Sequence, residues 1–163
     1  MTAAHEQVVR INFIERWPEH EPRENDPHYK FFHAAKARMK RQGLLNCNVR
    51  SAHHYGAIEL HHAACEFAHV NDIDIDRFNA LWGLHLDDEQ FREFVMGAQF
   101  TNDKGELVNG LEPLCTEHHR GVSGIHSLPS PEWNVLRAAK EDRAILIVQS
   151  NSGIGVDPAP QDA

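Results

Sequence analysis

The sequence predicts a single α+β domain, because stretches with apolar residues at helical spacing and stretches with alternating apolar residues follow one another along the chain. A length of 163 residues is typical of one domain. Hydrophobic residues make up 41% of the chain and charged residues 25%, which lies within the range of globular proteins. We therefore expect a compact core and no extensive disorder.

The N-terminal part is expected to be an arm over residues 1–26 that precedes the first helix. Residues 8–13 alternate well enough for a short strand, and several prolines then interrupt regular structure. The dipeptide Asp26-Pro27 is a typical helix start, since aspartate caps the first turn and proline fits the first helical position. Apolar residues then recur at helical spacing, so we predict a helix over 28–42 that ends at Gly43.

The middle of the chain is expected to hold a hairpin followed by a helical insert. Residues 44–49 and 57–61 have the pattern of two extended segments around the turn-like residues 51–56. Further on, the apolar spacing fits two short helices, and the pair Asp87-Asp88 supplies carboxylates at the N-terminus of the second. The insert is expected to occupy about residues 63–100.

The last third of the chain is expected to return to a strand that leads into a helical turn, over residues 111–119. A helix at 132–140 and a last strand or helix end at 144–149 follow from the apolar pattern. The tail at 151–163 has too few apolar residues to pack and is expected to be flexible. The domain is thus expected to span residues 27–150.

No segment has the length of a membrane span, since the longest apolar stretch is a handful of residues and about 20 are needed. The N-terminus carries a histidine and a glutamate where a secretory signal would have a basic start and an apolar core. The three cysteines lack C-x-x-C spacing, which argues against a disulfide framework and against a four-thiolate zinc site. We expect reduced thiols, no membrane partner and a cytoplasmic protein.

The charge balance gives no extended basic surface, with 16 basic against 24 acidic residues and a formal net charge of −8. Tight nonspecific binding to phosphates is therefore not indicated, and any contact with nucleic acid must be local. The basic stretch at 36–41 either contacts phosphates or complements the dipole of its helix as solvated surface.

The chemical signal is the excess of histidine, with 13 residues in the chain. Three adjacent pairs stand out: His53-His54, His61-His62 and His118-His119. The second and third pairs lie at the ends of predicted strands, so imidazoles from both can converge on one divalent cation. Adjacent residues of a strand point to opposite sides, so one member of each pair is expected to act differently, for example as a general base. Five other histidines are expected to be ordinary surface or core residues: His5, His20, His28, His33 and His85.

Two stretches of the chain, ELHH at 59–62 and LCTEHHR at 114–120, have Asn109 between them. Together they resemble the His-Asn-His (HNH) endonucleases of the ββα-metal class. The continuation to Trp133 is similar to a subgroup of small phage-associated HNH proteins. The resemblance covers about residues 44–137, and it implies a ββα-metal centre whose two halves are separated by the helical insert.

Carried over to this chain, the resemblance implies that His61 and His119 are metal ligands, that His62 is the general base and that Asn109 orients the metal loop. Hydrolysis of a phosphodiester needs a base that takes a proton from water and a cation that neutralises charge on the phosphate. The implied cofactor is one divalent cation, Mg, Mn, Ni or Zn. The implied partner is DNA, and the implied products carry 5′-phosphate and 3′-hydroxyl ends.

Other residues near the motif are weaker candidates. His126 is a possible third ligand, although glycines at 121 and 124 prevent its spacing from His119 being two regular helical turns. Arg120 is expected either to bind a phosphate oxygen of the substrate or to be a surface residue. Glu59 or Glu117 either fixes an imidazole tautomer or is a solvated acid.

The chain also departs from the family pattern. The expected asparagine would fall on Gly110, so Asn109 is displaced by one position. Many relatives hold a structural zinc in a thiolate knuckle, which is here reduced to Cys47 and Cys115. We therefore expect no structural zinc, although these two cysteines together with His118 still permit one.

The resemblance thus favours a metal-dependent DNA endonuclease, located in the host-cell cytoplasm if a phage encodes it. The alternative is a catalytically silent HNH scaffold that binds another protein, as in phage DNA packaging or the inhibition of a host factor. The net charge of −8 favours this alternative, while the joint presence of a base and ligands favours the enzyme. A third alternative is activity only within a larger complex that supplies positive surface.

Overall fold

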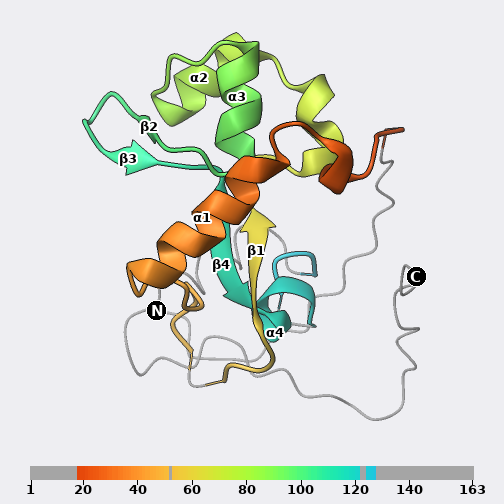
Figure 1. Ribbon diagram of the computed structural model, residues 1–163, viewed down its shortest axis with the longest axis vertical. Coiled ribbons are helices and arrows are strands. Elements are labelled where there is room, and N and C mark those ends of the chain that lie inside the picture. The colour runs from red at the N-terminus through yellow and green to blue at the C-terminus, as the bar shows by residue number, and fades with distance from the viewer. Residues whose placement is uncertain (1–17, 52, 122–123, 128–163) are drawn as a thin grey trace, which may run out of the picture.

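A computed structural model describes residues 18–51, 53–121 and 124–127, which form an α+β fold (Figure 1). Helices surround a central pair of strands, and a second, shorter strand pair projects to one side. Four predicted segments lie outside the described residues: the strand at 8–13, the helix at 132–140, the element at 144–149 and the tail at 151–163.

The central pair consists of β1 (Ile58–His62) and β4 (Leu111–Cys115), which run antiparallel. In their register, Ile58 lies opposite Cys115 and His62 lies opposite Leu111. All five residues of β4 are buried, so this strand is covered on both faces. The strand predicted at 57–61 and the strand predicted from 111 are confirmed.

The partner predicted for β1 was wrong. Residues 44–49 form no strand, and β1 pairs with β4 instead. The predicted segment makes one ladder-like contact, in which the amide of Asn48 donates to the carbonyl of Pro113 at 3.0 Å. Of its apolar residues only Val49 is buried, so this segment lacks the alternating buried face that a strand needs.

Helix α1 (Tyr29–Arg41) confirms the helix predicted after Asp26-Pro27 and lies across the central strand pair (Figure 1). A short 3-10 turn, η1 (Arg23–Asn25), precedes it. The N-cap is His28, however, so the prediction of Asp26 as the cap and Pro27 as the first helical residue was wrong. The Asp26 carboxylate instead accepts from the backbone amide of His28, two residues further on, at 2.7 Å. The buried side of α1 consists of Phe32, Ala35 and Met39.

The predicted insert contains η2 (Phe67–Asp72), α2 (Ile75–Trp82) and α3 (Asp88–Val95). Asp74 caps α2, and Asp87 forms a capping box with Gln90 at the start of α3. These caps explain why two short helices begin where the sequence predicted them.

A two-stranded hairpin, β2 (Phe100–Thr101) and β3 (Leu107–Val108), follows the insert around the turn predicted at 102–105. Strand β4 then leads into α4 (Thr116–Arg120), as predicted for this part of the chain.

The core has two main parts. One lies inside the helical insert and is formed by seven buried residues: Val70, Phe78, Leu84, Leu86, Phe91, Phe94 and Val95. The other lies between α1 and the central strands and is formed by Phe32, Ala35, Met39, Leu60, Met96 and Leu111. The lower end of the molecule has only Val49 and Leu114 as a buried apolar cluster. None of the helices in the described ranges has the length and apolarity required to cross a lipid bilayer.

The packing of the core between α1 and the central strands can be tested at Gly97. This residue has φ of 101° and lies where α3 approaches α1. A Cβ atom there would lie 2.5 Å from Cδ1 of Leu111 and 2.7 Å from Cβ of Ala35. We expect Gly97→Ala to lower the free energy of unfolding through overpacking. This loss should be roughly 1–3 kcal/mol and should add to the loss that backbone strain causes.

The matched control is Gly105→Ala, since Gly105 has φ of 77° and a Cβ there would meet no atom within 4 Å. Urea unfolding of both variants separates the packing cost from the cost of the left-handed conformation, which they share. Equal losses in the two variants would contradict the packing argument.

Candidate metal centres

The alternation of side chains along β1 divides its residues between two faces of the central strand pair. Leu60 packs in the core cluster beneath α1, and the ring of His62 stacks on Phe32 of that helix with centroids 5.8 Å apart. Glu59 and His61 face the other way, toward α4 and the residues that follow it. The expectation that the two histidines of this pair point to opposite sides of the strand is confirmed.

Three histidines meet on the α4 face, and we call them the histidine trio: His61 of β1, His119 of α4 and His126 of the segment after α4. Each offers one ring nitrogen, and these nitrogens lie within 4.8 Å of one another. The ring centroids are 5.3 Å apart for His61 and His119, and 5.0 Å apart for each of the two pairs that include His126. Three imidazoles at this separation are a donor set that suits a divalent metal ion.

A tight glycine turn carries His126 back to the trio. The amide of Gly124 donates to the carbonyl of Gly121 at 2.9 Å, and the amide of Ile125 donates to the carbonyl of His118 at 3.0 Å. A Cβ on Gly124 would lie 2.7 Å from the carbonyl oxygen of His119, so only glycine allows this close return. Of the residues described after α4, which are 121 and 124–127, none is helical, as expected from these glycines.

Glu59 orients the ring of His119 through a contact at Nδ1. Its Oε2 lies 2.6 Å from Nδ1 of His119, and its Oε1 accepts a hydrogen bond from Arg120. Burial by itself would raise the pKa of Glu59, but the hydrogen bonds and charges of His119 and Arg120 outweigh it and lower the pKa. With Nδ1 engaged by a carboxylate, Nε2 of His119 is the nitrogen left for a metal ion, which is the usual support for a histidine ligand.

Glu66 is the acid that the sequence analysis did not single out. It follows β1 directly before η2, and its Oε1 lies 3.8 Å from Nδ1 of His61 and 3.7 Å from Nδ1 of His126. The side chain is 30% exposed, so it borders the trio and still reaches solvent. Its sequence signals were a position a few residues after a histidine-bearing strand and a Glu-x-x-His spacing with His69, and neither points to this site.

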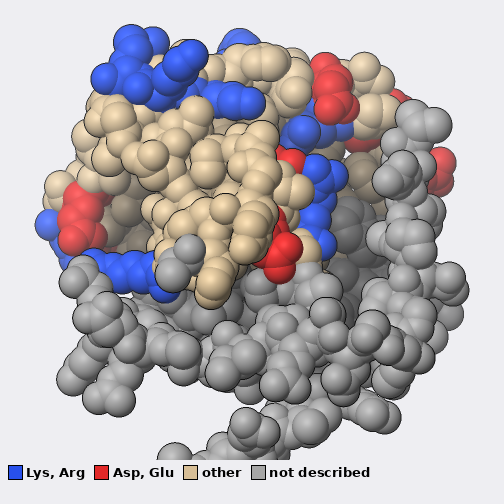
Figure 2. All heavy atoms as spheres, turned by 90° about the horizontal axis from the view of Figure 1, so that it is seen from below, with Lys and Arg blue, Asp and Glu red and all other residues tan. Residues whose placement is uncertain are grey.

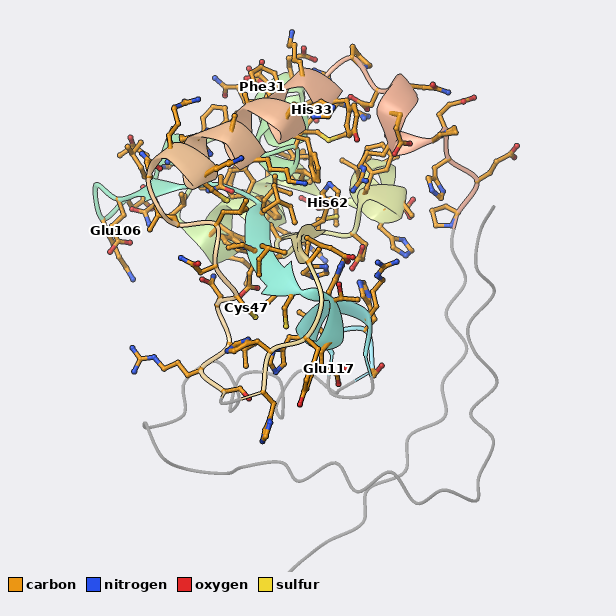
Figure 3. All side chains as sticks on the ribbon, turned by 60° about the horizontal axis from the view of Figure 1, so that its bottom comes forward. Phe31, His33, Cys47, His62, Glu106 and Glu117 are labelled. Atoms are coloured by element: carbon orange, nitrogen blue, oxygen red, sulfur yellow. The ribbon has the colours of Figure 1, made fainter. Side chains whose placement is uncertain are left out.

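His62, the base implied by the resemblance, does not line the trio. Its side chain lies beneath α1, near one end of the central strands. Cys47 and Glu117 of α4 lie toward the other end (Figure 3). Phe67 packs on the ring as well, at 6.0 Å between centroids. Burial, aided by the positive charges of Arg23 and His119, lowers the pKa of His62 to about 4. Its Nε2 is buried and finds no hydrogen-bond partner within the described part of the chain.

The remaining predicted residues are not among the three that could hold the ion. Oδ1 of Asn109 accepts from the amide of Leu111 at 3.0 Å, which fixes the start of β4. Arg120 is 63% exposed and leans on Glu59, at the border of the trio. Glu117 is half-buried on α4, and its carbonyl accepts from the amide of Gly121 at 2.9 Å, which ends the helix.

A second group of potential ligands lies at the lower end of the central strands, and we call it the cysteine–histidine group: Cys47, His54, Cys115 and His118. One ligand atom from each of the four lies within 4.8 Å of the others. The sequence analysis named three of these residues as possible zinc ligands and noted His54 only as a member of an adjacent pair, because it comes from a segment without regular structure.

Comparison of the chain with known proteins gave no match to any family model, to any curated protein or to any solved structure. The chemistry of the chain therefore has to be argued from its own residues.

The buried imidazole of His62 predicts a specific acid sensitivity. Its folded pKa of about 4 lies below the ordinary value of 6.5, so the unfolded chain binds the proton more readily. The contribution of neutral His62 to the free energy of unfolding is therefore complete above pH 6.5 and is lost as the pH falls from 6.5 through about 4. Replacing His62 by phenylalanine keeps a ring in the packing and removes this loss.

The free energy of unfolding, measured with urea between neutral and acid pH, should fall less for His62→Phe than for the wild type. The difference should reach roughly 3 kcal/mol at pH 4, since the pKa is lowered from 6.5 to about 4 and each pKa unit corresponds to about 1.4 kcal/mol. Parallel acid profiles for the two proteins would show that His62 is not held neutral in the fold.

Proposed function

We propose that the protein is a metal-dependent endonuclease of the HNH type that hydrolyses DNA phosphodiester bonds at the histidine trio. The observation that carries the proposal is the convergence of His61, His119 and His126, three imidazoles from separate segments, within 4.8 Å of one another. Surface histidines have no physical reason to gather in this way, because charged imidazoles repel one another.

The arrangement of the trio supports the same proposal. Its first two histidines belong to β1 and α4, and β4 joins these elements by pairing with the one and leading directly into the other. The order strand, strand and helix agrees with the ββα centre that the resemblance implies. The motif residues at 59–62 and 114–120, which carry the resemblance, are those that build this arrangement.

A divalent cation held by three imidazoles would neutralise charge on the scissile phosphate and keep coordination positions for oxygen ligands. The side chains around the trio have separate tasks in this proposal. Glu59 fixes the orientation of His119 through the contact at Nδ1. Arg120, at the exposed border, offers its guanidinium to a phosphate oxygen of the substrate.

The base that takes a proton from water is assigned to Glu66 in this proposal. Its carboxylate already lies beside His61 and His126, where it could accept a proton from water. The resemblance gives this role to His62, but that ring would first have to leave its packing against Phe32 and Phe67. The two assignments make opposite predictions for single variants.

DNA would have to be held by local contacts, because the chain as a whole is acidic. Lysine and arginine side chains gather at one edge of the face seen from below, over the C-terminal end of α1 (Figure 2). Lys36, Lys40 and Arg41 are exposed there, whereas Arg38 donates to the carbonyl of Gly97 at 3.0 Å. The exposed three supply the local positive charge that a DNA backbone requires.

The first test is nicking of supercoiled plasmid by the purified protein with magnesium, manganese, nickel or zinc. We expect cleavage that EDTA abolishes and that His119→Ala reduces by about 100-fold or more, because a ligand of the cation is lost. The matched control is His85→Ala, an exposed histidine of the insert paired with Asp103, which should cleave like the wild type.

Absence of cleavage with every metal would contradict the enzyme proposal and favour the alternative of a silent scaffold that binds another protein. Thermal unfolding with and without manganese then shows whether the trio still binds a cation, since a ligand of the folded state raises the melting temperature.

The second test separates the two candidate bases. We expect Glu66→Gln to lower the cleavage rate by about 100-fold or more, which is the usual contribution of a general base. We expect His62→Phe to retain the rate within about tenfold at neutral pH, because its ring serves the packing beneath α1. The reverse pattern would return the base role to His62.

A further inference from the structure

We propose that the cysteine–histidine group is a second metal site, a closed structural zinc site with Cys47, His54, Cys115 and His118 as its four ligands. It is separate from the histidine trio and shares no residue with it. The inference does not rest on the proposed function, since a structural zinc would hold the fold whether or not the trio is catalytic.

The three sulfur–nitrogen distances known within the group are compatible with tetrahedral coordination. Nδ1 of His118 lies 3.1 Å from Sγ of Cys115 and 3.5 Å from Sγ of Cys47, and Nδ1 of His54 lies 3.8 Å from Sγ of Cys115. Zinc bonds of about 2.3 Å to sulfur and about 2.0–2.1 Å to nitrogen place tetrahedral sulfur and nitrogen ligands about 3.6 Å apart. The three sulfur–nitrogen distances therefore bracket the value that zinc requires.

The donor chemistry selects zinc among the common divalent ions. Two thiolates and two imidazoles form the Cys₂His₂ set of structural zinc sites, and thiolates are poor ligands for magnesium, calcium and manganese. Cys115 and His118 are fully buried, while Cys47 is half-buried and His54 closes the group from the exposed side. Four protein ligands leave no position for water, so the site is structural and not catalytic.

A zinc ion at this position would stabilise the segment between α1 and β1, which has little other support. Between α1 and β1, none of the described residues belongs to a helix or a strand, and the apolar cluster beneath this segment contains only Val49 and Leu114 as buried residues. A few backbone hydrogen bonds attach the segment, among them the amide of Thr116 to the carbonyl of Ala57 at 3.0 Å. Small regions without a sufficient apolar core are commonly held by a metal ion. Zinc bound by Cys47 and His54 would fasten both halves of this segment to the end of β4.

The site also bears on the position of α4. His118 and His119 are neighbours on this helix, yet one joins the cysteine–histidine group and the other joins the histidine trio. The helix has five residues and is too short to be stable by itself. A zinc ion bound to His118 and to Cys115, which lies directly before the helix, would fix its first turn and with it the direction of His119.

Cobalt substitution tests the proposal, because cobalt bound by thiolates gives a near-ultraviolet charge-transfer band that imidazole ligands alone do not give. Cobalt(II) is added to the reduced, metal-free, full-length protein. We expect a band that saturates at one cobalt per chain, visible absorption typical of tetrahedral coordination, and displacement of both by zinc. The histidine trio contains no sulfur and cannot produce this band, so a failure of the proposed function leaves the readout unaffected.

Matched variants assign the ligands. Cys47→Ser should lose about half of the band or all of it, whereas Cys65→Ser, at the third cysteine of the chain, should keep it. His54→Ala should bind cobalt at least about tenfold more weakly, whereas its exposed neighbour variant His53→Ala should match the wild type. His119→Ala, in the other group, should retain the band in full.

The cobalt experiment would overturn the proposal if the wild type gave no charge-transfer band, if His54→Ala and His53→Ala bound cobalt equally well, or if the band depended on Cys65. A Cys47–Cys115 disulfide in the protein as purified, seen as a cross-linked peptide and a loss of two hydrogens in mass, would also overturn it.

Discussion

The whole arrangement depends on the antiparallel pairing of β1 with β4. Side chains of a strand alternate between its faces, so this one pairing sends Leu60 and His62 into the core beneath α1 and sends Glu59 and His61 toward α4. Slipping the register by one residue would exchange the two sets, burying Glu59 beneath α1 and removing His61 from the trio. The apolar contacts of the core therefore decide which polar residues meet on the other side.

Helix α4 shows how little regular structure is needed to organise two sites. It directly follows a strand whose residues are all buried, and the glycine turn after it approaches its backbone closely. Three kinds of polar contact orient its side chains: the carboxylate of Glu59, the sulfur atoms near His118 and the returning segment with His126. The helix is positioned by its neighbours on every side, which compensates for its shortness.

Much of the fold could be predicted from local signals, since α1, α3 and the step from β4 to α4 all have apolar periodicity or capping residues. The partner of β1 could not, because strand pairing is decided by long-range contacts that a local pattern does not contain. The convergence of His61 and His119 was expected from their motifs. His54 and Glu66 were not, because irregular segments deliver them and no spacing rule applies there.

The helical insert separates the two central strands in sequence, and this has a consequence for how the chain reaches its folded state. Closing so long a loop costs chain entropy before any contact between β1 and β4 can compensate for it. The insert has its own apolar cluster, and the carbonyl of Gly110, just before β4, accepts from the amides of Ala63 and Ala64, just after β1. An insert that condensed first would bring its two ends together, and the pairing of β1 with β4 would then have to close only a short loop.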